Sequence, residues 1–175
     1  RCIRNADDRG KGHAIRVGIA HATAPIHAQI DADLQFLPEE LPHLADPIRR
    51  GEADVVLGTR FTAGSTRLPG STPAVRTLGN KAVSAFASLL FGRRMTDVQA
   101  GMKAWSAEAM RTIAIGSDNY SYEVEIPVKA LQRGLRVVEV PVTTDHRRDG
   151  ATNVRVLAAG LALVRDITAF RLGWK

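Results

Sequence analysis

The sequence contains a single cysteine, Cys2, among its 175 residues. One cysteine excludes an intramolecular disulfide and a cysteine-rich metal site, and it is typical of a reducing compartment. Aromatic residues make up only 5% of the chain and no recognised nucleic-acid motif occurs, so nucleic acid is not expected as a partner. No apolar run approaches the length that a bilayer-spanning helix needs.

The chain has instead an ordinary globular composition with an excess of arginine. Hydrophobic residues make up 45% and charged residues 24%, so we expect one domain over residues 1–175 with a real core. The net charge is +6, and 19 of the 24 basic residues are arginine. Because arginine binds phosphate with two parallel hydrogen bonds, this charge favours phosphorylated substrates or an anionic membrane surface as partners.

Strand-like and helix-like segments alternate along the chain. Short apolar or β-branched runs predict strands, and periodic segments bounded by Gly or Pro predict helices. This alternation predicts an α/β layered domain with a mainly parallel sheet. The expected strands are 26–30, 53–58, 101–105 and 135–140, and the expected helices are 10–24, 38–50, 75–91, 107–113, 123–133 and 154–174.

Three of these expected helices carry more detailed expectations. For the last one, 154–174, we expect an amphipathic helix that either packs on the body of the domain or lies on a membrane surface. Glu123 and Glu125 begin another helix, where their charge is favourable at the amino end. The apolar side of the helix 75–91 is expected to comprise Leu78, Ala82, Ala85, Phe86, Leu89 and Leu90.

The segment Asp31-Ala32-Asp33-Leu34-Gln35 directly follows the predicted strand 26–30. Side chains two positions apart on a strand point the same way, so Asp31 and Asp33 would direct two carboxylates to one spot. Such a pair favours a hard cation, Mg²⁺ or Mn²⁺, with substrate phosphates completing its shell. The alternative is that the aspartates only cap the following helix, and the motif alone leaves both interpretations open.

The D-x-D segment is one of several motifs that follow one another in order along the chain. The ordered set resembles the family-two glycosyltransferases, in particular the branch that includes dolichol-phosphate mannose synthase and dolichyl- or undecaprenyl-phosphate glucosyltransferases. The motifs are Asn5 with G-K-G-H-A at 10–14, D-A-D-L-Q at 31–35, G-E-A-D-V-V-L-G-T-R-F at 51–61, Arg76 with L-G-N at 78–80, T-D-V-Q-A-G-M-K-A at 96–104, V-E-V-P-V at 138–142, and R-x-x-G-x-T at 147–152.

The resemblance implies a fold and an activity. The fold is a GT-A, Rossmann-like three-layer α/β sandwich. The activity is metal-dependent, inverting transfer of a sugar from a nucleotide-diphosphate sugar to a polyprenyl phosphate, at the cytoplasmic inner face of the membrane. A membrane-protein partner stays open. Family members begin with a strand and a V-x-x-P-x-x-N-E segment that does not occur here, so we expect a domain that lacks its first strands and binds the donor poorly alone.

The resemblance also implies roles for single residues. It assigns the metal to Asp31, Asp33 and Gln35. It assigns the donor diphosphate to the same three residues together with Lys11 and Arg147. It assigns the acceptor phosphate to Arg60, Arg76, Asn80 and Gln99. The expected catalytic residues are Asp33, Asp97 and Arg147, although Asp97 could equally cap or orient a turn, and Lys11 lies in a segment that could simply start a helix.

These residue types suit the chemistry that the resemblance implies. A metal ion and arginine stabilise the charge that develops on a departing diphosphate. A phosphate acceptor is already anionic, so it needs cationic positioning more than a strong base. Two other hypotheses remain: a nucleotidyltransferase of the same fold that makes the sugar nucleotide, and a non-catalytic fragment that binds anionic lipid.

Overall fold

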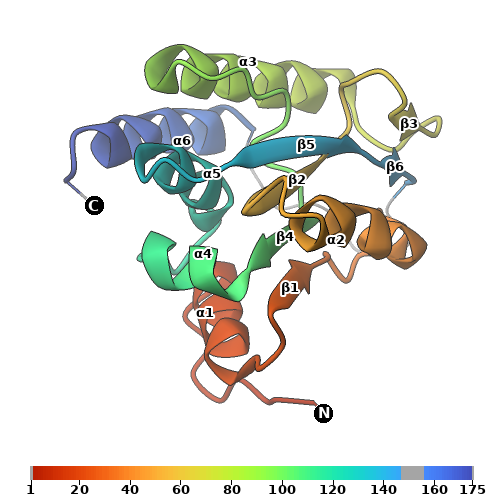
Figure 1. Ribbon diagram of the computed structural model, residues 1–175. Helices are drawn as coiled ribbons and strands as arrows, with labels where there is room; N and C mark the ends of the chain where they lie inside the picture. The colour runs from red at the N-terminus through yellow and green to blue at the C-terminus, as the bar shows by residue number, and fades with distance from the viewer. Residues whose placement is uncertain (1, 147–155, 175) are drawn as a thin grey trace.

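The computed structural model describes residues 2–146 and 156–174, which form helices packed around a central sheet (Figure 1). Every predicted helix and strand forms, with ends shifted by a few residues. In chain order the elements are α1 (Lys11–His21), β1 (Ile26–Gln29), the 3-10 helix η1 (Pro38–Glu40), α2 (Leu41–Arg49), β2 (Val55–Thr59), β3 (Thr66–Arg67), α3 (Ala74–Phe91), β4 (Lys103–Ser106), α4 (Ala107–Ile113), α5 (Tyr122–Gln132), β5 (Val137–Pro141), β6 (Thr143–Thr144) and α6 (Val156–Arg171).

The central sheet contains four strands in the order β1-β4-β2-β5. Strand β4 is antiparallel to both of its neighbours, whereas β2 and β5 are parallel. The expectation of mainly parallel pairing is therefore wrong, although β1, β2 and β5 share one direction. The reason is that the segment 92–102 returns the chain to the edge where β2 ends, where Gly58 N–H donates to the carbonyl of Met102 at 2.9 Å.

Strand β2 shows how the two faces of the sheet are covered. Val55 and Leu57 belong to a core that includes Trp105 and residues of α4 and α5. Val56 belongs to a second core, which contains Leu44 of α2. Successive side chains of a strand point to opposite faces, so one strand fills both cores. The expected three-layer α/β sandwich is confirmed, with α2 on one face of the sheet and α4 and α5 on the other.

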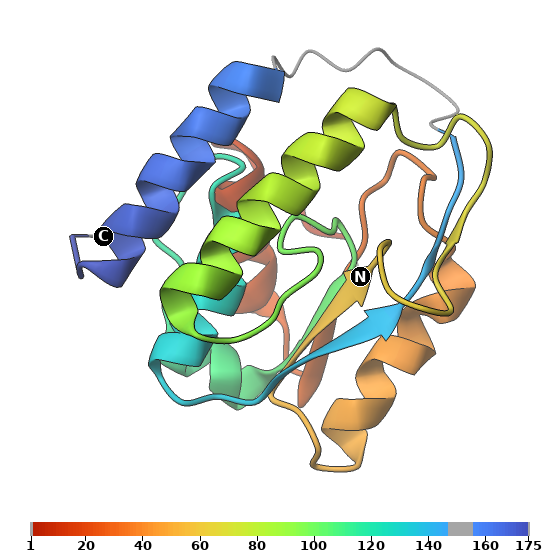
Figure 2. The same ribbon diagram turned by 90° about the horizontal axis from the view of Figure 1, so that it is seen from above.

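Helices α3 and α6 lie side by side and cover α5 from outside the sheet layer (Figure 2). Leu163, Ile167 and Phe170 of α6 are buried against this cluster, so α6 packs on the body of the domain. Its outer face, which includes Leu157 and Leu161, is exposed. Of the two arrangements expected for this segment, packing on the body of the domain is therefore present in the residues that the structure describes.

Helix α3 buries a different face from the one that its apolar residues predict. Phe86 and Leu90 are half-buried against the cluster formed with α6, as expected. The prediction is wrong for the other four residues of the expected apolar side, because their side chains are exposed: Leu78, Ala82, Ala85 and Leu89. The face that is buried instead comprises Asn80, Val83, Ser84 and Ala87.

Hydrogen bonding explains why a polar face of α3 points inward. Ser84 Oγ accepts a hydrogen bond from Val98 N–H at 3.1 Å. Ser88 Oγ accepts from Met95 N–H at 2.9 Å and donates to the carbonyl of Met95 at 3.0 Å. Buried backbone groups of the segment 95–98 require partners, and the two serines of α3 supply them. Apolar periodicity alone does not reveal this demand.

In the part of the chain that the structure describes, no helix is long and apolar enough to cross a membrane.

The inverted face of α3 predicts a contrast between two alanines of the same helix. Ala87→Asp places a carboxylate at a fully buried position, so we expect it to lower the free energy of unfolding by roughly 3 kcal/mol or more. Ala85→Asp, at an exposed position, should change it by less than about 0.5 kcal/mol. Urea denaturation followed by circular dichroism measures both, and the reverse order would contradict the observed face.

Candidate active site

The carboxyl ends of β1 and β2 lie at the same edge of the sheet, because both strands run antiparallel to β4 between them. Asp31 follows β1, and Arg60 directly follows β2. Gly101, just before β4, packs against Asp31 so closely that a Cβ atom at this position would lie 2.2 Å from Asp31 Oδ2. The D-x-D and G-T-R motifs therefore meet where open α/β sheets usually bind ligands.

Asp31 is held by a lysine from α1. Lys11 Nζ lies 2.6 Å from Asp31 Oδ1 and 2.8 Å from Glu123 Oε1. Lys103 of β4, which is fully buried, forms a second ion pair with Glu123. The carboxylate of Glu123 thus joins the beginning of α5 to both α1 and the sheet.

Two neutral side chains extend this network. Tyr122 Oη donates to Glu123 Oε1 at 2.6 Å, and Gln29 Nε2 of β1 donates to Tyr122 Oη at 2.7 Å. Burial and the neighbouring Glu123 carboxylate both raise the pKa of Tyr122, so its hydroxyl stays protonated as a donor. The network therefore connects residues from α1, β1, β4 and α5.

Burial and ion pairing act in opposite directions on the two carboxyl groups. Burial raises the pKa of Asp31 above its usual value, and the nearby Lys11 only partly offsets it. Burial also raises the pKa of Glu123, but Lys103 and Lys11 outweigh this effect and leave it below its usual value. Glu123 is thus a stable anion, whereas Asp31 gains from further positive charge.

Asp33 and Gln35 form a tight turn after the strand. Asp33 Oδ1 accepts a hydrogen bond from Gln35 N–H at 3.2 Å, and Leu34 between them has a left-handed backbone with φ of 61°. Gln35 Nε2 donates to the carbonyl of Ser71 at 3.0 Å. The alternative that the aspartates cap the following helix is wrong for Asp33, because it closes a local turn, whereas the N-cap of η1 is Leu37 and has no side-chain hydrogen bond. Gln35 ties this turn to the segment 61–73.

Asp31 and Asp33 fit a divalent cation by their chemistry. Both are carboxylates beside the end of β1, and Asp31 is incompletely neutralised. Among the described residues no group of three or more His, Cys, Asp or Glu side chains could hold a metal ion. A Mg²⁺ or Mn²⁺ ion held by these two carboxylates would have to take its remaining ligands from phosphate oxygens and water.

Arg60 is fixed by a bidentate ion pair with Asp97. Arg60 Nε lies 2.6 Å from Asp97 Oδ2, and its Nη2 donates to Asp97 Oδ1 at 2.7 Å. Asp97 is fully buried and only 11% of the Arg60 side chain is exposed. The turn that carries Asp97 is itself held by Glu139, which accepts hydrogen bonds from the N–H groups of Thr96 and Asp97 at 2.7 and 3.0 Å.

Arg60 lies within the electrostatic reach of the Asp31 network. Burial lowers the pKa of Arg60, but the carboxylates of Asp97, Glu123 and Asp31 raise it and leave it above its usual value. Arg60 and Asp31 are far apart in the sequence but follow strands that end at the same edge of the sheet.

Three further predicted site residues lie on α3 and in the segment before β4. Arg76 lies in the first turn of α3 and is half-buried, and Asn80 is buried one turn later. Gln99 is half-buried in the segment before β4, with its Oε1 atom buried and unpartnered within the described residues. Arg147, expected at the donor diphosphate, lies outside the described residues.

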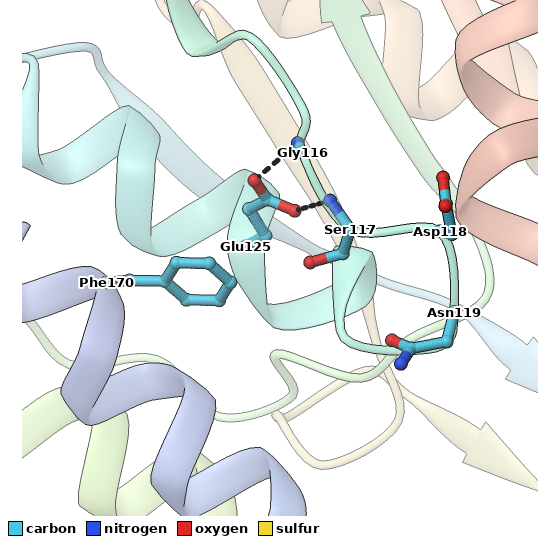
Figure 3. A pocket seen from close by; sticks show the side chains of 6 residues that line it. All are labelled: Gly116, Ser117, Asp118, Asn119, Glu125 and Phe170. Atoms are coloured by element: carbon cyan, nitrogen blue, oxygen red, sulfur yellow. Dashed lines mark hydrogen bonds between the residues drawn. The ribbon is translucent and has the colours of Figure 1, made fainter. Parts of the chain in front are cut away.

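A pocket of about 340 Å³ lies elsewhere, between the segment 116–119, the beginning of α5 and Phe170 (Figure 3). Glu125 lines this pocket. Its carboxylate accepts hydrogen bonds from Gly116 N–H at 2.7 Å and from Ser117 N–H at 2.9 Å, and it forms an ion pair with Lys129. None of the predicted site residues lines it. Glu125 therefore fixes the loop before α5, which is a structural role.

Sequence reasoning missed the central part of the site, Glu123 with Lys103 and Tyr122. The sequence predicted only that the charge of Glu123 is favourable at the beginning of a helix. It did not predict that the Glu123 side chain is buried. A signal was present, since Glu123 and Glu125 alternate with Tyr122, Val124 and Ile126 in a run that is buried throughout. Acidic residues inside such a run need cationic partners.

The Glu123 network predicts a pH-dependent loss of stability. Glu123→Gln leaves Lys103 and Lys11 without their shared anion, so we expect a loss of roughly 3 kcal/mol or more at pH 7. The pKa of Glu123 is lowered in the folded state, so its contribution is complete above the usual glutamate pKa and disappears as the pH falls through the folded value.

Denaturation from pH 7 to pH 3 measures this effect, and the difference between wild type and Glu123→Gln should shrink toward acid. The control is Glu52→Gln, which removes an exposed pair with Arg50 and should cost less than about 1 kcal/mol. A difference between wild type and Glu123→Gln that stays constant down to pH 3 would contradict the ion pairing of Glu123.

Solved structures with the same fold are glycosyltransferases of GT-A type. Glucosyl-3-phosphoglycerate synthase from Mycobacterium tuberculosis, in complex with Mn²⁺, uridine diphosphate and glucosyl-3-phosphoglycerate, superimposes with a TM-score of 0.69 at 22% identity. The match covers 96% of this chain and 57% of that one. The expected GT-A fold is therefore confirmed.

Curated relatives carry names from lipid-linked sugar transfer. The dolichyl-phosphate hexose transferase of Haloferax volcanii is 30% identical over 161 residues, which cover 92% of this chain and 68% of the relative. The undecaprenyl-phosphate mannosyltransferase of Micrococcus luteus is 32% identical over 139 residues, covering 78% of this chain and 56% of the relative. The chain spans about half the length of the curated relatives that it matches. For two other relatives from Haloferax volcanii, the matched part is 38% and 49% of the relative's length.

The sequence model of one protein family, described as glycosyl transferase family 2, matches residues 1–91 of the 175. This match contains both the D-x-D turn and the G-T-R-F segment, the two motifs that meet at the edge of the sheet. The chain belongs to glycosyl transferase family 2.

Proposed function

We propose that this chain is the catalytic part of an enzyme that transfers a sugar from a nucleotide-diphosphate sugar to a polyprenyl phosphate, with inversion of the anomeric carbon. The observation that carries this proposal is that the D-x-D turn and the Arg60 guanidinium, held by Asp97, follow β1 and β2 at the same edge of the sheet. A carboxylate turn and a fixed guanidinium serve two different phosphate groups. Family membership favours sugar transfer over nucleotidyl transfer, and the names of the relatives support the class of acceptor.

On the donor side, Asp31 and Asp33 would hold Mg²⁺ or Mn²⁺ together with the diphosphate. The bound ion supplies neutralisation of the charge that develops on the leaving group. Gln35 orients the turn through its N–H bond to Asp33 and offers its amide oxygen to the metal. Lys11 contributes a second positive charge beside Asp31, and Arg147 is assigned to the diphosphate by its motif.

On the acceptor side, Arg60 would bind the phosphate of the lipid, with Arg76, Asn80 and Gln99 contributing nearby. Asp97 is buried and engaged with Arg60 through both of its oxygens. We therefore assign Asp97 a positioning role rather than direct contact with the reacting atoms. A guanidinium held in this way loses little freedom when it binds a phosphate.

The reaction would then be a direct displacement. An oxygen of the acceptor phosphate attacks the anomeric carbon while the bond from that carbon to the diphosphate breaks. The nucleoside diphosphate leaves with the electron pair, and its charge is the one that the Asp31–Asp33 side must stabilise. Since the attacking phosphate is already an anion, this step needs no strong general base.

The proposed acceptor is anchored in a membrane by its lipid. We therefore place the enzyme at the inner, cytoplasmic face of the membrane as a peripheral protein, where its donor is water-soluble and its acceptor is embedded. The positive net charge of +6 supports such a location.

The D-x-D assignment predicts the loss of metal-dependent transfer. In the enzyme that contains this chain, Asp33→Ala should lower kcat/KM by about 100-fold or more in the presence of Mn²⁺, because a metal ligand is lost. Transfer of labelled sugar to decaprenyl phosphate measures it. Asp46→Ala, which removes an exposed helix carboxylate paired with Arg49, is the control. Full activity of Asp33→Ala would remove the assignment.

The acceptor assignment predicts a selective change in KM. Arg60→Lys keeps the charge but loses the two parallel hydrogen bonds to Asp97, so the KM for polyprenyl phosphate should rise by roughly 10-fold. The KM for the sugar nucleotide should stay unchanged. Arg50→Lys is a matched control, because Arg50 forms the same two-bond pair with the exposed Glu52. A rise confined to the KM of the donor would contradict the assignment.

A further inference from the structure

The half-buried ring of Phe61 is surrounded by three cations at the end of β2. Its centroid lies 5.3 Å from Cζ of Arg60, 5.6 Å from Cζ of Arg67 and 5.4 Å from Nζ of Lys81. We call these three cations the Phe61 cluster. They come from three separate parts of the fold: the end of β2, strand β3 and helix α3. Because a ring has only two faces, at least two of the cations lie on the same side, where they can contact one anion together.

Hydrogen bonds hold the parts of the cluster together. Phe61 N–H donates to Thr59 Oγ1 at 3.2 Å, which fixes the backbone that carries the ring. Arg67 Nη1 donates to Thr77 Oγ1 at 3.3 Å, which ties β3 to the first turn of α3. Thr77 and Lys81 are four residues apart and therefore lie on the same side of that helix. The fold thus brings the cations to the ring from elements that are bonded to one another.

The charge of the Phe61 cluster is only partly balanced. Asp97, which is fully buried, pairs with Arg60 through both of its oxygens. Arg67 and Lys81 are exposed, and neither pairs with a carboxylate among the residues that the structure describes. Cation–π attraction at an exposed site is weak, whereas neighbouring like charges repel one another. An anion bound beside the ring would therefore stabilise the cluster.

The three cations contribute differently to the binding of such an anion. The bonds to Asp97 use Nε and Nη2 of Arg60, and its Nη1 atom makes no hydrogen bond within the described part of the chain. Nη1 can therefore donate to an oxygen of the anion and orient it. The charge of Arg60, however, is already balanced by Asp97. Within the Phe61 cluster, the net attraction for negative charge therefore comes from Arg67 and Lys81.

Two unbalanced cations match a doubly charged anion. At neutral pH a phosphate monoester carries about two negative charges, whereas a phosphate diester carries only one. We propose that Arg67 and Lys81 are specificity-determining residues, which select a doubly charged phosphate monoester as the acceptor and discriminate against singly charged phosphates. The role of this monoester as a substrate rests on the proposed function, whereas the charge selection is a binding property of the cluster.

Charge selection also distinguishes the acceptor from the product of the proposed reaction. The attacking phosphate oxygen forms a bond to the anomeric carbon while the bond from that carbon to the diphosphate breaks, and the electron pair leaves with the nucleoside diphosphate. The doubly charged monoester thereby becomes a singly charged diester, with no proton transferred. Its Coulomb attraction to Arg67 and Lys81 falls with its charge. The cluster therefore favours binding of the acceptor and release of the product.

Titration calorimetry of the enzyme that contains this chain tests the selection. Farnesyl phosphate and its methyl diester carry the same lipid and differ in charge. At pH 8 and low salt, the wild type should bind the monoester at least about 10-fold more tightly than the diester. Arg67→Gln combined with Lys81→Gln should lower this ratio to about 2, mainly by weakening the binding of the monoester. Both positions are exposed, so the thermal midpoint should not change.

Two control variants separate the cluster from net charge and from side-chain shape. Arg93→Gln combined with Arg94→Gln removes the same charge at exposed positions after the end of α3 and should keep the wild-type ratio. Arg67→Lys combined with Lys81→Arg keeps both charges at the ring and should keep the ratio as well. An unchanged ratio in the Arg67→Gln, Lys81→Gln variant would overturn the proposal. So would an equal loss in the variant that lacks Arg93 and Arg94.

Sugar transfer separates this proposal from the proposed function. A wild-type enzyme that binds the monoester selectively but transfers no sugar to it supports the charge selection and overturns only the proposed function. A wild-type enzyme that transfers sugar to the monoester but binds both compounds equally overturns only the charge selection. In an active enzyme, Arg67→Gln combined with Lys81→Gln should raise the KM for the monoester roughly 10-fold and leave the KM for the sugar nucleotide unchanged.

Discussion

The ion pairs of Glu123 are the interaction on which the rest of the site depends. Its carboxylate lies between Lys103, buried in the sheet, and Lys11, which also contacts Asp31. An anion buried at this position is tolerable only with both cations. In turn, Lys11 connects the first helix to the D-x-D turn. The position of Asp31 is therefore set by charges from three other segments and by the close approach of Gly101.

The same edge of the sheet carries a second group of charges, in which a buried anion holds a cation in place. Arg60 is a cation fixed by a buried anion, Asp97, whereas Asp31 is an anion that burial leaves short of positive charge. In the proposed function, Arg60 binds an anionic phosphate and Asp31 a cation that is itself bound to phosphate. Strand β4 lies between the two, which keeps them adjacent without direct pairing.

Helix α3 connects this chemistry to the surface of the molecule. Its amino end carries Arg76 and Asn80, its inner face uses serines to hold the turn before Asp97, and its outer face is apolar. Because Ser84 and Ser88 bond backbone groups of the segment 95–98, the leucines are left outside.

Much of this architecture could be predicted from the sequence, because it follows from local signals. Glycine and proline boundaries and β-branched runs predicted the four strands of the central sheet and the six α-helices, but not the short strand β3. The D-x-D and G-T-R motifs, picked out from the sequence, lie at the same edge of the sheet. Three features could not be predicted. The direction of β4 depends on where a loop returns, the inward face of α3 depends on backbone groups of another segment, and the role of Glu123 depends on lysines 20 and 112 residues away.

The most direct test of the account is Mn²⁺ binding to the enzyme that contains this chain, followed by electron paramagnetic resonance with saturating nucleoside diphosphate. The account predicts tight binding by the wild type, and its loss in both Asp31→Asn and Asp33→Asn. Wild-type Mn²⁺ affinity in both variants would contradict it, because the two carboxylates would then have no part in holding the departing diphosphate.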